Sequence, residues 1–236
     1  MDALMGEQIA GADLSDWRKL ARGLHARFLT EDFAAGASFV AAVGGGGDSI
    51  GHHPRVSMGP GFVDLKLITA DAVYRDDDDG TELVFEWVTQ QDVDPARRIS
   101  SVAAERGLTA APAAVSHIEL GPDAAESSTI APVWAALLTG IAEAQGHGSP
   151  SDEIRDPAGR VPNLWFGDPD EGGAARHTFH VEVYVAPEVV EERIAAAISA
   201  GGTVVDDSQS PGLTVLADRE GNRGVICADT SSASRG

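Results

Sequence analysis

The residues with the clearest chemical capacity are two adjacent histidines, His52 and His53, followed by Pro54. Imidazole is the side chain whose ordinary pKa lies nearest neutrality, so it can give or take a proton at working pH. Pro54 cannot continue a helix and pushes His53 towards extended backbone. Asp48 lies four residues before His52, a spacing of one helical turn that would let it orient the ring. The spacing indicates acid–base chemistry; the simpler alternative is that one histidine caps a helix and the other is solvated.

The composition excludes several classes of function. The 236 residues carry 37 acidic against 17 basic side chains, a formal net charge of −20. Nucleic acids and anionic membranes attract clustered Lys and Arg, so we expect neither as a partner. The single cysteine, Cys227, excludes an intramolecular disulfide and a cysteine-cluster metal site. No apolar run reaches the length of a membrane span and no signal peptide is evident, which favours a cytoplasmic protein.

Alternating apolar and polar residues predict the strands that must position the histidine pair. The alternating stretches are residues 23–30, 61–69 and 81–88. Before them, the run 14–20 predicts a single turn of helix with Trp17 in the core. Residues 1–12 show no periodicity and predict a frayed start.

Helical spacing appears in two longer stretches of the first half. Thr30 is the predicted N-cap of the first helix, whose end is weakened by the four glycines at 44–47. Asp92 opens the second helix, and Gly107 ends it. The order strand, helix, strand, strand, helix predicts an α+β domain, an antiparallel sheet with helices on one face.

Residues from about 13 to 109 resemble the pterin-4a-carbinolamine dehydratase family, the 4a-hydroxytetrahydrobiopterin dehydratases. The resemblance rests on Trp17-Arg18, Phe33 and Phe39, the acidic residue before His-His-Pro, the strand that follows, and Thr89-Gln-Gln-Asp92. It implies removal of water from the 4a-carbinolamine of a tetrahydropterin, giving the quinonoid dihydropterin without a metal or bound cofactor. A pterin substrate and a homodimer are further expectations from the resemblance.

The resemblance also implies four catalytic residues. His52 and His53 fall on the family's histidine pair, Asp92 falls on its aspartate, and Asp48 takes the place usually held by glutamate. His52 would donate and accept the proton, and His53 would bind substrate or share that work.

One position departs from the family pattern. The family places a third histidine after a threonine at the end of the central strand, but here Thr69 is followed by Ala70 and then Asp71. Because a carboxylate can relay protons, Asp71 is the expected partial substitute. We expect Thr69 and Asp71 to contact the substrate.

The second half of the chain contains an internal repeat. Val-Ser-His117-Ile-Glu-Leu and Thr-Phe-His180-Val-Glu-Val are matching strands, offset by 63 residues (180 − 117). Each strand leads to a helical stretch, at 130–141 and 189–198, and then to a hairpin with an Asp-x-x-Gly turn. The small-residue linker at 108–112 divides the chain into predicted domains at 1–109 and 113–230.

Two βαβ-hairpin modules in tandem resemble the vicinal oxygen chelate superfamily, a fold of βαβββ type that includes glyoxalase I and extradiol dioxygenases. The segments 163–166, 176–183 and 216–222 are most similar to its glyoxalase-like members. The resemblance implies a pocket with metal ligands on the first and last strand of each module. His117 and His180 occupy first-strand positions, and we expect both, with Trp165, to contact a small molecule.

Neither half of the chain predicts a metal site. The closing strands at 164–167 and 223–225 offer no carboxylate or imidazole, and two histidines fall short of the three protein ligands usual for a catalytic metal. The four aspartates at 76–79 are not interleaved as a calcium loop would require, and suit a hairpin tip.

The sequence leaves three alternative functions. The first is dehydration of a 4a-hydroxytetrahydropterin by the first domain. The second is a non-catalytic protein that binds a small molecule or serves dimerisation. The third is a metal-dependent lyase or dioxygenase that uses His117 and His180.

Overall fold

The computed structural model describes two compact units. The described residues are 1–47, 52–75, 80–122, 124, 127–128, 131–132, 134–135, 153–156, 159, 161–167, 179–217 and 223–231. Asp48, the aspartates at 76–79 and most of the helix predicted at 130–141 lie outside them. Unit 1 holds Met1–Ser116, Val185–Val189 and Asp229–Gly236; unit 2 holds His117–Tyr184 and Val190–Ala228.

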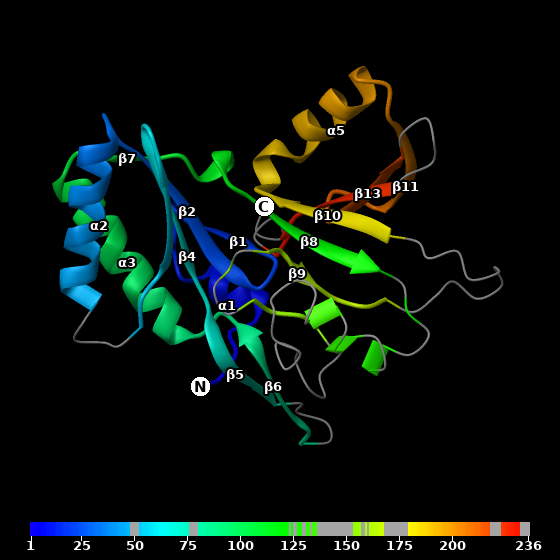
Figure 1. The fold of residues 1–236 in the computed structure, drawn as a ribbon, viewed down its shortest axis with the longest axis horizontal. Coiled ribbons are helices and arrows are strands. Elements are labelled where there is room, and N and C mark those ends of the chain that lie inside the picture. The colour runs from blue at the N-terminus through cyan, green and yellow to red at the C-terminus, as the bar shows by residue number, and fades with distance from the viewer. Residues whose placement is uncertain are drawn as a thin grey trace. The chain divides into compact units, whose positions relative to one another are not determined.

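Unit 1 is the predicted α+β assembly of an antiparallel sheet and helices (Figure 1). Its helices are α1 (Gly6–Ala10), α2 (Phe33–Gly47) and α3 (Gln90–Glu105), with a 3₁₀ turn at Pro112–Ala114. Its strands are β1 (Arg18–Leu20), β2 (Gly23–Leu29), β3 (Arg55–Gly59), β4 (Phe62–Leu67), β5 (Thr69–Arg75), β6 (Glu82–Trp87) and β7 (Thr109–Ala110). The main sheet has the order β1-β2-β4-β3, with β7 also paired to β2, while β5 and β6 form a separate two-stranded sheet.

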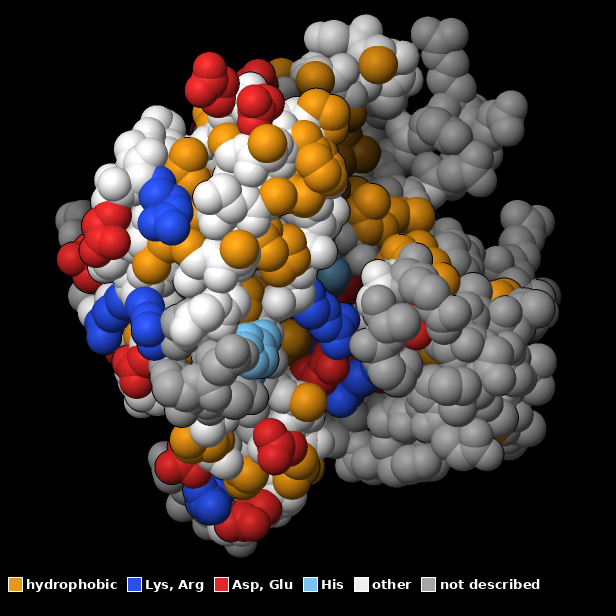
Figure 2. Space-filling view, turned by 60° about the vertical axis from the view of Figure 1, so that its left-hand side comes forward, with side chains coloured by type: hydrophobic (Ala, Val, Ile, Leu, Met, Phe, Trp, Pro, Cys, Tyr) orange, Lys and Arg blue, Asp and Glu red, His pale blue; other side chains and the backbone are white. Residues whose placement is uncertain are grey.

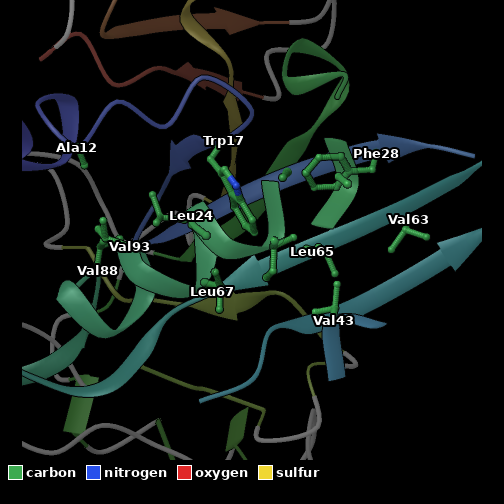
Figure 3. Close-up of a cluster of buried hydrophobic side chains, with 14 of the residues drawn as sticks. Ala12, Trp17, Leu24, Phe28, Val43, Val63, Leu65, Leu67, Val88 and Val93 are labelled. Carbon is green, nitrogen blue, oxygen red and sulfur yellow. The ribbon is translucent and has the colours of Figure 1, made fainter. Parts of the chain in front are cut away.

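The core of unit 1 forms where the alternating strands meet the helices. On β4, Val63 and Leu65 are buried as their alternation predicts, and they pair across the sheet with Phe28 and Ala26 of β2. Phe39 of α2 packs edge-on against Phe28, with ring centroids 5.3 Å apart. Figure 3 shows these strand side chains gathered with residues of the helices in one apolar cluster. Burial of this apolar face holds α2 and α3 against the sheet.

The start of the chain differs from its prediction. The run 14–20 was expected to form a turn of helix, but its second half is strand β1, in which Lys19 pairs with Leu24 of β2. Residues 1–12 are not frayed throughout, because Gly6–Ala10 form α1. Tertiary bonds explain this: the Leu4 amide donates to the Val88 carbonyl at 2.8 Å. Trp17 is buried in the core, as predicted.

The helix boundaries are close to the predicted ones. α2 begins three residues after Thr30, and the amide of Ala35 donates to Oδ1 of Asp32 at 2.8 Å, so Asp32 caps the helix in place of Thr30. α3 ends at Glu105, and Gly107 follows with a φ of +69°, the left-handed conformation of a terminating glycine.

Unit 2 is built on one six-stranded sheet. Its elements are β8 (Ser116–Pro122), β9 (Asn163–Leu164), β10 (Phe179–Val185), α5 (Val190–Ser199), β11 (Thr203–Gln209), β12 (Leu213–Ala217) and β13 (Arg223–Cys227). The strand order is β11-β12-β13-β10-β8-β9. The two strands of the predicted repeat, β8 and β10, are therefore neighbours in the sheet. Among the helices described in either unit, none is long and apolar enough to cross a membrane.

Candidate functional site

His52 and Asp92 form a direct hydrogen bond in unit 1. His52 Nε2 lies 2.7 Å from Oδ1 of Asp92. The Asp92 side chain is completely buried, whereas 19% of the His52 side chain is exposed. Because an ionised carboxylate only accepts hydrogen bonds, Nε2 carries the proton and Nδ1 is the ring atom left to accept one. A buried acid that fixes one imidazole nitrogen in this way orients the ring for proton transfer at the other.

The start of α3 holds Asp92 in place. Thr89 is the N-cap residue, with extended backbone, and its side chain accepts a hydrogen bond from the amide of Gln91. Asp92 Oδ2 accepts in return from the amide of Thr89 at 2.8 Å. This reciprocal pair is a capping box, with aspartate in the place usually held by glutamate. It satisfies amides that have no partner within the helix and puts the negative charge at the positive end of the helix dipole.

Thr69 lies behind the carboxylate. Its hydroxyl donates to Oδ2 of Asp92 at 2.7 Å, and its oxygen is 2.8 Å from the hydroxyl of Thr89. Since the Thr69 proton is given to Asp92, Thr89 is the donor between the two hydroxyls. Thr69 is 3% exposed. The sequence suggests a substrate contact for Thr69, and the structure places it against the buried acid.

The remaining predicted residues of the first domain lie apart from this network. His53 is exposed next to His52, and Asp71 is exposed on β5. The bonds of Asp92 go to His52, Thr69 and Thr89 and do not include Asp71. Thr89 was not among the predicted site residues; its signal was the Thr-x-x-Asp spacing before an apolar helix.

Unit 1 also has a cavity of about 340 Å³ whose walls include Ile9, Leu14, Trp17 and Leu24. Trp17 donates from its indole nitrogen to Oγ of Ser100 at 3.1 Å. None of the predicted catalytic residues is on the cavity wall. The cavity is therefore separate from the His52–Asp92 pair.

The three predicted contact residues of unit 2 lie among acidic partners. His117 Nε2 is 3.6 Å from Oε1 of Glu119, and His180 Nε2 is 3.8 Å from Oε1 of Glu182. Trp165 packs edge-on against His180, with centroids 5.5 Å apart. Sequence reasoning overlooked both glutamates, although each stands two residues after its histidine in the repeated strand pattern.

The described residues offer no arrangement of three or more His, Cys, Asp or Glu side chains suited to a metal ion. Burial, with added repulsion from Glu182 and Glu119, raises the pKa of the Cys227 thiol to about 12. The same causes raise the pKa of Tyr184 above its ordinary value. Both groups therefore stay protonated near neutral pH, and Tyr184 donates its hydroxyl proton to Glu182.

Comparison with known proteins yields two family matches and a likeness to solved structures. Residues 3–102 match the model of the family described as pterin 4 alpha carbinolamine dehydratase, and residues 119–227 match that of the glyoxalase-like domain. The chain resembles the crystal structure of a transcriptional coactivator/pterin dehydratase from Brucella melitensis, with 21% identity and a TM-score of 0.34, over 43% of this chain and 99% of that one. No curated protein matches the chain. By the two family models, the chain contains a pterin 4 alpha carbinolamine dehydratase domain followed by a glyoxalase-like domain.

Proposed function

We propose that the first domain is a hydro-lyase that dehydrates a 4a-hydroxytetrahydropterin to the quinonoid dihydropterin, with His52 as the proton-transfer group. The family match supports the class of reaction. The observation that carries the residue assignment is the 2.7 Å hydrogen bond between His52 Nε2 and the buried Asp92. It leaves Nδ1 to exchange the proton.

The elimination balances without any redox partner. The bond from C4a to the hydroxyl breaks, a neighbouring N–H loses its proton, and a C=N double bond forms between these two atoms. His52 Nδ1 accepts the proton, and the imidazolium is stabilised by the adjacent Asp92 carboxylate. The departing hydroxyl takes up a proton and leaves as water, so the histidine returns to its starting state. In this proposal His53, which is exposed beside His52, binds the substrate or shares the proton transfer.

Ala70 stands where the family pattern has a third histidine. A general acid or base contributes roughly 10²–10⁴-fold to a rate, so the two remaining histidines must carry the reaction. Asp71 follows Ala70 on β5 and is exposed, which leaves it free to meet a substrate that approaches from solvent.

The test is dehydration of chemically generated 4a-hydroxytetrahydropterin, followed by absorbance with the intact protein, His52→Ala and no enzyme. We expect a rate above background that falls by roughly 10²–10⁴-fold in His52→Ala, the contribution of one acid–base group. Val56→Ala, an exposed position on β3, is the matched control and should keep the full rate. An unchanged rate in a folded His52→Ala variant would remove His52 from the mechanism. If the intact protein gave only the background rate, the first domain would have the fold of the family without its activity.

A further inference from the structure

Unit 2 carries a polar sheet face that the proposed dehydration does not use. We call it the His–Glu face, and it comprises His117, Glu119, Trp165, His180, Glu182 and Tyr184. β8 and β10, which supply five of these residues, are neighbours in the sheet and are drawn side by side in Figure 1. Residues two apart on a strand project from the same side, so each strand presents its members together.

The opposite face of the same sheet is apolar and partly covered, although Ile118 of β8 remains 44% exposed. Leu120, Leu164 and Phe166 alternate with residues of the His–Glu face and pack against the helical residues Ala131 and Ala135. The polar face is therefore the one that carries groups able to orient a charged or polar ligand.

Two contacts fix how β8 and β10 lie against each other. A Cβ added to Gly121 would come within 2.7 Å of the His180 ring, so β10 begins beside the end of β8. At the other end, the rings of His117 and Tyr184 are 6.5 Å apart. The two strands therefore run in opposite directions along this face.

Glu119 and Glu182 are the middle residues between those two contacts, so their carboxylates lie opposite each other. They are only 4% and 9% exposed. Both carboxylates also lie near the same neighbours: after burial, their negative charges raise the pKa of Tyr184 and of the Cys227 thiol. Two like charges held together away from water repel each other strongly.

Among the described residues, these carboxylates have as partners neutral donors or imidazoles at a distance. Oε2 of Glu182 accepts from the Tyr184 hydroxyl at 2.9 Å and from the Trp165 indole at 3.3 Å. The histidine Nε2 atoms, at 3.6 and 3.8 Å, are beyond normal hydrogen-bond distance. Within the described part of the chain, no Lys or Arg forms an ion pair with Glu119 or Glu182. A buried pair of carboxylates without a positive charge between them is costly.

We propose that the His–Glu face binds a small organic cation, a protonated amine or a guanidinium on an aromatic or apolar body. The positive charge would lie between Glu119 and Glu182, and the body would rest on the ring of Trp165. The histidine side chains, 19% and 22% exposed, form the rim through which a ligand reaches the acids beneath. Fixed carboxylates in a partly desolvated site bind a cation more strongly than exposed ones do.

The first test uses the full-length protein and three phenylalkyl probes of similar shape and different charge: 2-phenylethylammonium, 2-phenylethanol and 3-phenylpropionate. Isothermal titration calorimetry at about pH 7.5 keeps the amine protonated. We expect one ammonium to bind per chain, the alcohol to bind about tenfold to hundredfold more weakly, and the carboxylate not to bind. This series compares ligands on one protein, so it does not depend on the folding of a variant.

The second test separates the site from a general attraction of cations to a chain of net charge −20. Glu182→Gln should weaken ammonium binding by about tenfold or more. Glu192→Gln, exposed on α5, removes the same charge and should leave the affinity unchanged. The proposal would be overturned if the amine and the alcohol bound with equal affinity, or if both variants lost the same affinity for the amine. It would also be overturned if neither 2-phenylethylammonium nor benzamidine bound. Stoichiometric binding of Zn²⁺ that excludes the amine would replace it with a metal site.

Discussion

At the scale of single residues, Asp92 uses its two oxygens differently. Oδ1 accepts from His52, whereas Oδ2 accepts from the Thr89 amide and the Thr69 hydroxyl. The sequence predicts His52 and Asp92 as site residues because their types and spacing are informative. It does not predict that Thr69 faces inwards, because a threonine at the start of a strand can point either way.

Replacing Thr69 distinguishes its role as a hydrogen-bond donor to Asp92 from the substrate contact predicted from the sequence. Thr69→Val keeps the shape of the side chain and removes one donor to Asp92, so we expect kcat to fall about tenfold with KM little changed. Thr69→Ser restores the hydroxyl and should restore most of kcat. A rise in KM alone would instead support the substrate contact predicted from the sequence.

At the scale of elements, alternation predicts buried strands well and exposed strands poorly. β4 follows its pattern because alternate residues lie in the core, whereas β2 is buried at every residue from Gly23 to Ala26. β3 was missed because Arg55–Gly59 lie at the sheet edge, mostly exposed, and need no alternation. β1 was predicted as helix because its three residues carry little pattern of their own, and pairing with β2 decides their conformation.

Replacing either of two glycines with alanine should have opposite effects on the stability of the protein. Gly107 has a φ of +69° with nothing within 4 Å of an added Cβ, so Gly107→Ala should cost roughly 1 kcal/mol through backbone strain alone. Gly45, within α2, also has open space around it, and Gly45→Ala should gain about 0.5–1 kcal/mol. Chemical denaturation measures both; a stabilising Gly107→Ala would show that the C-terminal turn of α3 relaxes freely.

At the scale of the whole molecule, acidic residues outnumber basic ones by 37 to 17. Figure 2 shows red and blue groups interspersed with orange hydrophobic ones on the described part of one face, so the excess is not confined to a single patch there. A large net charge of one sign keeps a protein soluble, but the like charges repel one another and destabilise the folded state.

Salt should therefore stabilise the protein. Raising NaCl from about 0.01 to 0.15 M shortens the screening length from about 30 to 8 Å, which weakens repulsion between exposed carboxylates. We expect the Tm to rise over this range, measured by thermal denaturation at constant pH. Sucrose at matched osmolality is the control for effects unrelated to charge. A falling Tm would mean that attractive ion pairs dominate.

The internal repeat predicted more of the second half than any single motif. It located β8 and β10 and the two histidines on them, because matched spacing survives even where the pattern of one strand is weak. Glu119 and Glu182 lie on the same first strands but were overlooked, because the metal-site template takes one ligand from each of these strands and the histidines already occupy that place. The carboxylates become noticeable only when the sheet brings the two strands together.

The carboxylate of Asp92 bonds both to the candidate catalytic residue His52 and to the first turn of α3, so the site and the fold depend on the same side chain. A substitution at position 92 would disturb the start of α3 even in a homologue without the proposed dehydration activity, since Oδ2 accepts a hydrogen bond from the Thr89 amide. Selection for folding alone would retain the aspartate. Within the described part of the chain, the side-chain hydrogen bond of His52 goes to Asp92 and not to a helix terminus. Among homologues, the identity of residue 52, rather than that of residue 92, would therefore distinguish active from inactive members.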